Sequence, residues 1–422
     1  MVKLIKRGKR LGLVAMASFL AVALVVSACA PARALAGSQE KVVKVGWDGI
    51  LTGPLADTGV SATNGLKDCA RFINERGGIN GVEIIVDWED TRAEIPRTIT
   101  VHKRLKERGM LMEVNIILGT VEANMRSILR DEIPMLMVTG HSDLTLAKDD
   151  QGLRWVFTLF PSYRAEGWAP AAWLKENWTE ERPPRAGAML YDHISALEGG
   201  EGFKIACKEL GIEFVGTEIV PWMGAIDTTT EWLRLAAKKP DMVFVGDCGA
   251  TLVTNIKTAK RLEIMERGIK LVHVEHCFDD ALHVVGKDAE GWYVFRPFPS
   301  ATADADLRGM KIMLEKAEEY RGWEPEKVEG SYIPGWIAMT VMEEAFRLAI
   351  EKVGYDNLSG RAVRDGLASI KGFDCEGLMP PITLSDKHPY ACERIRLYQI
   401  REGKFSLVSD KWYPYPIMLD VD

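Results

Sequence analysis

The feature that most constrains the fold is a regular alternation of short apolar runs with longer amphipathic segments. From residue 42 onward, near-continuous apolar runs of strand length are separated by segments with helical periodicity. This alternation is typical of a parallel sheet covered by helices on both faces. The first set predicts strands at Val42–Trp47, Val82–Trp88, Asn115–Leu118 and Pro134–Thr139, and helices at Ser61–Arg76, Ile95–Arg108 and Ala123–Asp131.

The pattern then starts again. The second set predicts helices at Tyr163–Asn177, Ala196–Leu210, Thr228–Lys238 and Thr251–Arg261, and strands at Arg185–Leu190, Glu213–Ile219, Met242–Val245 and Lys270–Val274. Two such sets in 422 residues predict two similar α/β lobes rather than one core. Two further helices, Ser331–Lys352 and Gly360–Ile370, precede a tail that alternates like two antiparallel strands, Ile395–Ile400 and Phe405–Val408.

The N-terminus predicts export. Five basic residues within the first ten precede an apolar run, Leu11–Val26, and then Val26-Ser27-Ala28-Cys29, which resembles a bacterial lipobox. We therefore expect a signal peptide over residues 1–28, lipidation of Cys29, and a tether over residues 29–40. A conventional cut after Ala36 and a retained helical anchor are the alternatives, and each of the three places the mature chain outside the cytoplasm.

Charge and cysteine content limit the partners and the chemistry. A formal net charge of -7 argues against nucleic-acid binding, which needs clustered Lys and Arg. Six cysteines follow Cys29, and an even number in an exported protein permits disulfides. We favour Cys375–Cys392 as the first pair because these two are close in sequence and flank a Pro-rich loop; buried thiols are the alternative.

Three runs carry a family resemblance. Residues 45–59 (VGWDGILTGPLADTG), 73–81 (INERGGING) and 372–383 (GFDCEGLMPPIT) stand in the order and spacing found in type I periplasmic binding proteins. The chain thus resembles the branched-chain amino-acid (Leu/Ile/Val) binding proteins of ABC importers. The resemblance implies two doubly wound Rossmann-like lobes joined by a three-strand hinge, with the ligand between them. It places lobe 1 at residues 41–160 plus 297–392, and lobe 2 at 161–296 plus 393–422.

The same resemblance implies a ligand site. Lobe 1 would hold a carboxylate through the loops that follow Leu118 and Val138, and the end of a lobe-2 strand would supply Glu275 for an ammonium. Helix capping and solvent exposure are the simpler explanations of these residues. Glu122 departs from the family pattern, because its charge would repel a ligand carboxylate. The loop residues are Thr120, Glu122, Asn124, Gly140, His141 and Ser142.

The positions at which the family covers its ligand with aromatic rings hold Thr58, Ala196 and Cys248 here. Aromatic cover would then come from other residues, and the equally plausible alternative for each is core packing. The candidates are Trp47, Tyr163, Tyr191 and Trp222.

The sequence therefore predicts an exported, lipid-anchored solute-binding protein of an ABC importer. We expect it to be a monomer that captures an amino acid or a related small carboxylate or amide and presents it to a membrane permease. No catalysis, cofactor, metal or nucleic acid is expected. A sensory module acting with a separate receptor is one alternative. A zinc enzyme is another, built from His273, Glu275, His276 and Cys277 with Asp247 and Cys248, although adjacent strand residues face opposite ways.

Overall fold

The computed structural model describes residues 41–53, 55–140, 142, 145, 147–222, 224–274 and 277–414. The predicted signal peptide, Cys29 and the tether lie outside these residues. The first sheet is parallel throughout, with strand order β2-β1-β3-β4-β5. Its strands are β1 (Val42–Gly49), β2 (Glu83–Asp90), β3 (Met112–Asn115), β4 (Met135–Met137) and β5 (Val156–Thr158).

The second sheet has the order β12-β11-β10-β9-β8-β6-β7 and is parallel except at β11 and β12, which pair antiparallel. This confirms the predicted α/β class and the predicted antiparallel tail. The strands are β6 (Arg185–Tyr191), β7 (Glu213–Val220), β8 (Met242–Gly246), β9 (Lys270–Val274), β10 (Tyr293–Arg296), β11 (Arg394–Arg401) and β12 (Lys404–Pro414).

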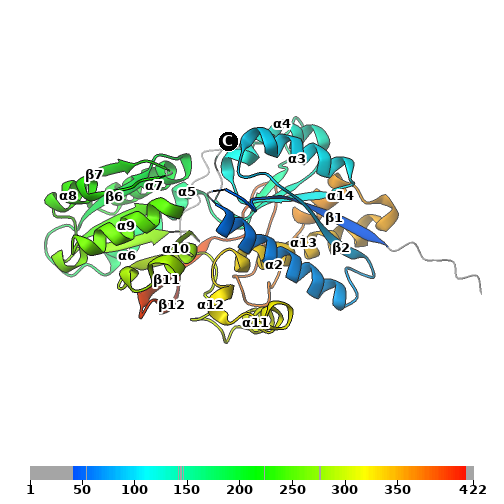
Figure 1. Ribbon diagram of the computed structural model, residues 1–422. Coiled ribbons are helices and arrows are strands. Elements are labelled where there is room, and N and C mark those ends of the chain that lie inside the picture. Colours follow the sequence, from blue (N-terminus) through cyan, green and yellow to red (C-terminus); the bar gives the residue numbers. More distant parts are fainter. Residues whose placement is uncertain are drawn as a thin grey trace, which may run out of the picture. The chain divides into compact units, whose positions relative to one another are not determined.

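Helices cover both sheets. In Figure 1, α3 and α4 lie on one side of β1 and β2, and α2 and α13 lie on the other side. The helices packed with the first sheet are α2 (Ala56–Glu75), α3 (Ile95–Glu107), α4 (Leu118–Asp131), α11 (Arg308–Arg321), α12 (Pro325–Val328), α13 (Tyr332–Val353) and α14 (Gly360–Leu367). Those of the second sheet are α5 (Tyr163–Glu166), α6 (Trp168–Glu176), α7 (Ile194–Glu209), α8 (Thr229–Ala237), α9 (Gly249–Arg261) and α10 (Cys277–Val285).

Helices α2 and α13 approach each other closely because each has a glycine at the contact. A Cβ on Gly65 would stand 2.1 Å from the backbone oxygen of Tyr332, and one on Gly335 would stand 2.5 Å from that of Ala62. No side chain fits at either place. Two glycines follow the end of α2: Gly77 has a φ of 98° and Gly78 one of 67°, and glycine adopts this backbone conformation readily after a helix.

The two largest hydrophobic clusters are separate and correspond to the two sheets, which we call lobe 1 (first sheet) and lobe 2 (second sheet). The chain passes from lobe 1 to lobe 2 after β5, returns after β10, and enters lobe 2 again at β11. A buried ion cluster stands at the second passage. Arg296 Nη2 lies 2.8 Å from Asp279 Oδ2 and 3.2 Å from Glu329 Oε2, so the buried guanidinium is paired on both sides.

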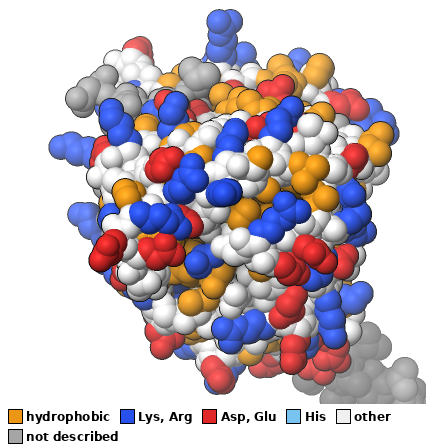
Figure 2. Space-filling model, turned by 90° about the vertical axis from the view of Figure 1, so that its left-hand side faces the viewer, with side chains coloured by type: hydrophobic (Ala, Val, Ile, Leu, Met, Phe, Trp, Pro, Cys, Tyr) orange, Lys and Arg blue, Asp and Glu red, His pale blue; other side chains and the backbone are white. Residues whose placement is uncertain are grey.

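The surface carries charges of both signs. Figure 2 shows one face of the molecule, on which Lys and Arg alternate with Asp and Glu and no single sign gathers into a large patch. Over the described ranges, no helix is long and apolar enough to cross a membrane.

Candidate functional site

The strongest candidate site is a pocket to which both lobes contribute. Its cavity volume is about 70 Å³. It lies where β1, β3, β4, β6 and β8 end, and the carboxyl ends of parallel strands are the usual ligand position in such sheets. We call it the cleft pocket. Its lining residues are Ile50, Leu55, Thr58, Ile116, Ile117, Leu118, Thr139, Tyr163, Tyr191, His193, Ser195, Trp222 and Cys248.

A smaller pocket adjoins it and shares Tyr163, Tyr191 and Ser195. Its volume of about 20 Å³ is enough for one water-sized group. We call it the inner pocket, and its lining adds Glu166, Ala196, Gly199, Phe244, Gly246, Asp247 and Val274. Of the residues that the sequence predicted for ligand contact, Thr58, Tyr191 and Cys248 thus line the cleft pocket, and Tyr191 and Ala196 the inner one.

The lobe-1 wall of the cleft pocket is apolar. Strand β3 ends at Asn115 and helix α4 begins at Leu118. The strand predicted over Asn115–Leu118 is therefore wrong, because the real strand lies earlier in the chain and ends where the predicted one begins. The apolar Ile116 and Ile117 form the turn that faces the pocket, and the predicted loop residues Gly119–Asn124 lie within α4 instead. Aliphatic side chains therefore line the lobe-1 side of the cleft pocket, where the prediction placed a loop with hydroxyl groups that bind a ligand carboxylate.

Thr120 and Asn124 belong to a buried polar network inside lobe 1. Thr120 Oγ1 donates 2.8 Å to the carbonyl of Ile117 and lies 3.0 Å from Asn115 Nδ2. Asn115 Nδ2 also donates 2.6 Å to Asp48 Oδ2, which accepts from Thr98 as well. Neither Thr120 nor Asn124 is among the residues that line the two pockets, and their role as ligand contacts stays a prediction.

The Glu122 carboxylate has a partner of its own. Ser142 Oγ donates 2.6 Å to Glu122 Oε1, and neither residue lines the cleft pocket. The Glu122 carboxylate, which was predicted to repel a ligand carboxylate, is thus bound to a side chain of lobe 1. His141 and Glu275, which the sequence proposed for the two ends of an amino acid, lie outside the described residues.

Two further predicted residues have clear surroundings. Trp47 is fully buried, donates from Nε1 to Thr63 Oγ1 at 2.7 Å and lines neither pocket, and its role as ligand cover stays a prediction. Gly140 permits a close approach, because a Cβ there would stand 3.1 Å from the Pro161 carbonyl oxygen and from the Tyr163 ring. The other three aromatic candidates, Tyr163, Tyr191 and Trp222, do line the cleft pocket.

The lobe-2 wall is aromatic and polar. The rings of Tyr191, His193 and Trp222 stack in sequence, with centroids 5.6 Å and 4.5 Å apart. Ser195 Oγ lies 2.7 Å from the Tyr191 hydroxyl and 2.9 Å from His193 Nδ1. Burial lowers the pKa of His193, so its imidazole is neutral at neutral pH and can present an uncharged face.

Sequence reasoning missed His193, Ser195 and Asp247, which line the two pockets. Asp192 and His193 directly follow β6, and Asp247 directly follows β8. The rule that polar residues after parallel strands face the ligand site would have found His193 and Asp247, whereas Ser195 lies in the first turn of α7. The same rule selects Asp48 near the end of β1, whose carboxylate serves the network inside lobe 1.

Two side-chain hydrogen bonds join the lobes at the cleft pocket: Thr139 with the Tyr163 hydroxyl, and Thr58 with Asp280. Thr58 Oγ1 in α2 donates 2.5 Å to Asp280 Oδ2 in α10. Burial raises the pKa of Asp280 to about 6, against the lowering effect of this hydrogen bond and with a further increase from the charge of Asp57. The carboxyl group of Asp280 therefore changes its protonation state near pH 6.

The cysteine and metal expectations have different outcomes. The structure keeps Cys375 and Cys392 as separate thiols, so the Cys375–Cys392 disulfide is wrong here. Cys392 Sγ lies 2.7 Å from the Arg394 carbonyl oxygen, whereas Cys375 is buried in the core beside Asp374 and Glu376. Among the residues that the structure places, no group of three or more His, Cys, Asp or Glu side chains could hold a metal ion. The zinc alternative also used Glu275 and His276, which are not described.

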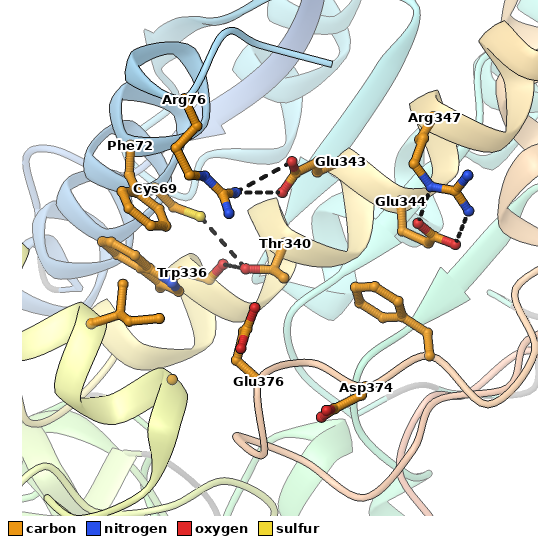
Figure 3. Close-up of a pocket in the computed structure, with 13 residues that line it drawn as sticks. Cys69, Phe72, Arg76, Trp336, Thr340, Glu343, Glu344, Arg347, Asp374 and Glu376 are labelled. Atoms are coloured by element: carbon orange, nitrogen blue, oxygen red, sulfur yellow. Dashed lines mark hydrogen bonds and ion pairs between the residues drawn. The ribbon is translucent and has the colours of Figure 1, made fainter. Parts of the chain in front are cut away.

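A third pocket, drawn in Figure 3, is larger, but its charged side chains are paired with one another within the protein. Its volume is about 210 Å³, and it lies between α2, α11, α13 and the loop after α14. In Figure 3, Arg76 points to Glu343 and Arg347 to Glu344, and the arginines lie 3.3 Å and 2.7 Å from these carboxylates. Asp374 and Glu376 are paired with Arg308. Each of these four carboxylates already has an arginine partner, so the cleft pocket is the better candidate for a solute.

Comparison with known proteins identifies the family of this chain. The family model described as "periplasmic binding protein" matches residues 42–404. A Leu/Ile/Val-binding protein, BraC3, of Rhizobium johnstonii is 24% identical over 274 residues, which cover 63% of this chain and 70% of that protein.

Two solved structures share the fold. A branched-chain amino-acid ABC transporter protein from Thermus thermophilus with bound valine superposes with a TM-score of 0.78 at 19% identity, over 89% of this chain and 97% of that one. A solute-binding protein of an ABC transporter from Rhodopseudomonas palustris BisB5, in complex with 3,4-dihydroxybenzoic acid, gives a TM-score of 0.70 at 18% identity over 89% and 97%. One fold thus serves chemically different solutes.

Proposed function

Because this chain belongs to the periplasmic binding protein family, we propose that it is the exported solute-binding component of an ABC importer. The observation that carries the proposal is the cleft pocket, whose lining comes from strand ends of both lobes. A solute held there touches lobe 1 at Ile117 and lobe 2 at Trp222, so its binding favours the conformation in which the two walls are close.

The solute is an amino acid or a related small carboxylate or amide. Relatives support this class: BraC3 is a Leu/Ile/Val-binding protein, and the R. palustris protein was crystallised with an aromatic acid. The apolar wall of Ile50, Leu55 and Ile116–Leu118 fits an aliphatic or aromatic body rather than a sugar, whose hydroxyls would need many hydrogen-bonding partners.

The remaining parts of the proposal concern location and partners. We propose lipidation at Cys29, the lobe limits given by the family resemblance, and delivery of the solute by the monomer to a membrane permease. Metabolic labelling with a radioactive fatty acid tests the anchor: the wild type should incorporate label and Cys29→Ala should not. Label in the Cys29→Ala protein would reject this lipidation site.

A thermal-shift screen tests the solute-binding function itself. Ligand-stripped protein is screened against amino acids, keto and hydroxy acids, aromatic acids and amides. A solute at a hundred times its dissociation constant stabilises the folded state by about 2.7 kcal/mol, which raises the melting temperature by several degrees. A shift that is lost in Trp222→Ala supports the cleft pocket as the site. No shift with any class would reject the function.

A further inference from the structure

We infer that the solute carries a primary ammonium group, and that Asp247 and Glu166 hold this group in the inner pocket. The inference rests on the proposed function and narrows it: the solute class becomes amines and amino acids with an apolar body, and excludes acids that lack an amine. The observation behind it is a pair of buried carboxylates, only 3% and 4% exposed, that line one small pocket next to the cleft pocket.

Asp247 is positioned by the fold and still has one oxygen available. Asn255 Nδ2 donates 2.5 Å to Asp247 Oδ2, and Asn255 is fixed in turn by Trp232 Nε1, 3.1 Å from its Oδ1. His273 Nε2 donates 2.9 Å to the Asp247 carbonyl oxygen and stays 3.6 Å from Oδ1. Within the described part of the chain, Oδ1 is buried and has no hydrogen-bond partner. A buried carboxylate oxygen without a donor is costly, so it calls for a ligand donor.

The inner pocket suits an ammonium group in size and in chemistry. Its volume of about 20 Å³ admits one non-hydrogen group of the size of a water molecule. No Lys or Arg is among its described lining residues, whereas Glu166 and Asp247 supply negative charge and the Tyr191 and Ser195 hydroxyls supply further oxygens. An ammonium has three donors and no acceptor, and it binds most strongly to carboxylates shielded from water.

The neighbouring walls exclude the opposite orientation. A ligand carboxylate placed in the inner pocket would meet two carboxylates, which repel it. The apolar body of the solute then extends from the inner pocket past Tyr163 and Tyr191 into the cleft pocket, toward Ile116 and Ile117. The two pockets share these tyrosines, so one solute can occupy both.

Two matched sets of solutes test the inference by isothermal titration calorimetry. Each set keeps one apolar body and changes only its charged group: leucine, 3-methylbutylamine and 4-methylpentanoate form the first, and phenylalanine, phenethylamine and 3-phenylpropionate the second. We expect the amine and the amino acid of at least one set to bind, and the acid to bind at least about 100-fold more weakly.

Isosteric variants then locate the ammonium. Asp247→Asn should weaken binding of the amine at least about 30-fold, and Glu166→Gln should weaken it in the same direction. Asp48→Asn is the matched control, because Asp48 is also 3% exposed and also has an unpartnered Oδ1, but lines neither pocket. Its affinity for the amine should equal that of the wild type.

Several outcomes would overturn the inference. Equal or tighter binding of the acids, or wild-type affinity for the amine in both Asp247→Asn and Glu166→Gln, would reject the ammonium assignment and leave the solute-binding function standing. Binding of none of the six compounds, together with a shift for another solute in the broader screen, would do the same. Only a failure of both panels would reject the proposed function as well.

Discussion

The two walls of the cleft pocket are built from equivalent strand ends but use their polar residues in opposite ways. On the lobe-1 side, Asp48, Asn115 and Thr120 hydrogen-bond to one another inside the lobe, and aliphatic side chains face the pocket. On the lobe-2 side, His193, Ser195 and Asp247 line the pockets directly. A polar residue after a strand is therefore not sufficient evidence of ligand contact. Its hydrogen-bond partners decide whether it belongs to the interior of the lobe or lines the pocket.

The largest expected effect concerns the interior of lobe 1. His102 Nδ1 lies 2.5 Å from Glu113 Oε2, and both side chains are buried. Burial alone lowers the pKa of His102, but the hydrogen bond to Glu113 and the charges of Glu113 and Asp131 outweigh it and raise the pKa. His102→Leu should lower the free energy of unfolding by about 3–5 kcal/mol, because it leaves Glu113 buried without its partner. Urea unfolding measures this.

The control for that variant is His283→Leu, which changes an exposed histidine of α10. Its stability should stay within about 0.5 kcal/mol of the wild type. If His102→Leu unfolded at the same urea concentration as the control, the buried pair would not stabilise lobe 1. A large loss of solute affinity in His102→Leu would break the distinction between an internal lobe-1 network and a ligand-facing lobe-2 wall.

The next effect concerns the hydrogen bond between Thr58 of lobe 1 and Asp280 of lobe 2. The pKa of Asp280 is raised to about 6 from 3.8, so the folded state holds a proton that the unfolded state releases first. A raised carboxyl pKa favours folding at low pH, and this contribution is lost as pH rises from about 4 to about 6. The loss amounts to about 3 kcal/mol, since each pKa unit corresponds to about 1.4 kcal/mol.

Asp280→Asn isolates this contribution, because an amide does not titrate and can still accept from Thr58. Between about pH 4 and about pH 7, the wild type should lose more stability than the variant, by up to about 3 kcal/mol. Parallel stability curves for the two proteins, measured by urea unfolding, would show that Asp280 titrates with an ordinary pKa.

The third prediction tests the aromatic stack of lobe 2. Trp222→Ala should reduce solute affinity about 30-fold, because it removes a large ring that lines the cleft pocket and stacks on His193. Trp88→Ala is the control, since Trp88 lies in β2 with 38% of its surface exposed and lines neither pocket. Calorimetry measures the solute affinity of both variants. Equal affinities would show that the aromatic stack does not contribute to solute binding.

The sequence predicted the fold well and the site only in part. The short apolar runs and the helical periodicity between them identified most elements, because these signals are local. The boundary between β3 and α4 was misplaced because Ile116-Ile117-Leu118 is apolar, and such a run fits a strand end or a helix start equally well. Asp48 and Asn115 meet across 67 residues of sequence, so no local pattern could show that Thr120 is already satisfied.

The smallest expected effects compare one hydroxyl from each wall. Thr120→Val should lower the free energy of unfolding by about 1–2 kcal/mol, because Asn115 loses a buried partner, and should leave solute affinity unchanged. Ser195→Ala should do the reverse: its stability changes by less than about 1 kcal/mol, while affinity falls about 10-fold as the Tyr191 and His193 contacts are lost from the pocket. Each variant is the control for the other, since both remove one hydroxyl that is almost fully buried. A loss of affinity in Thr120→Val, with wild-type affinity in Ser195→Ala, would restore the family's lobe-1 loop as the binding wall and reverse the comparison between the two lobes.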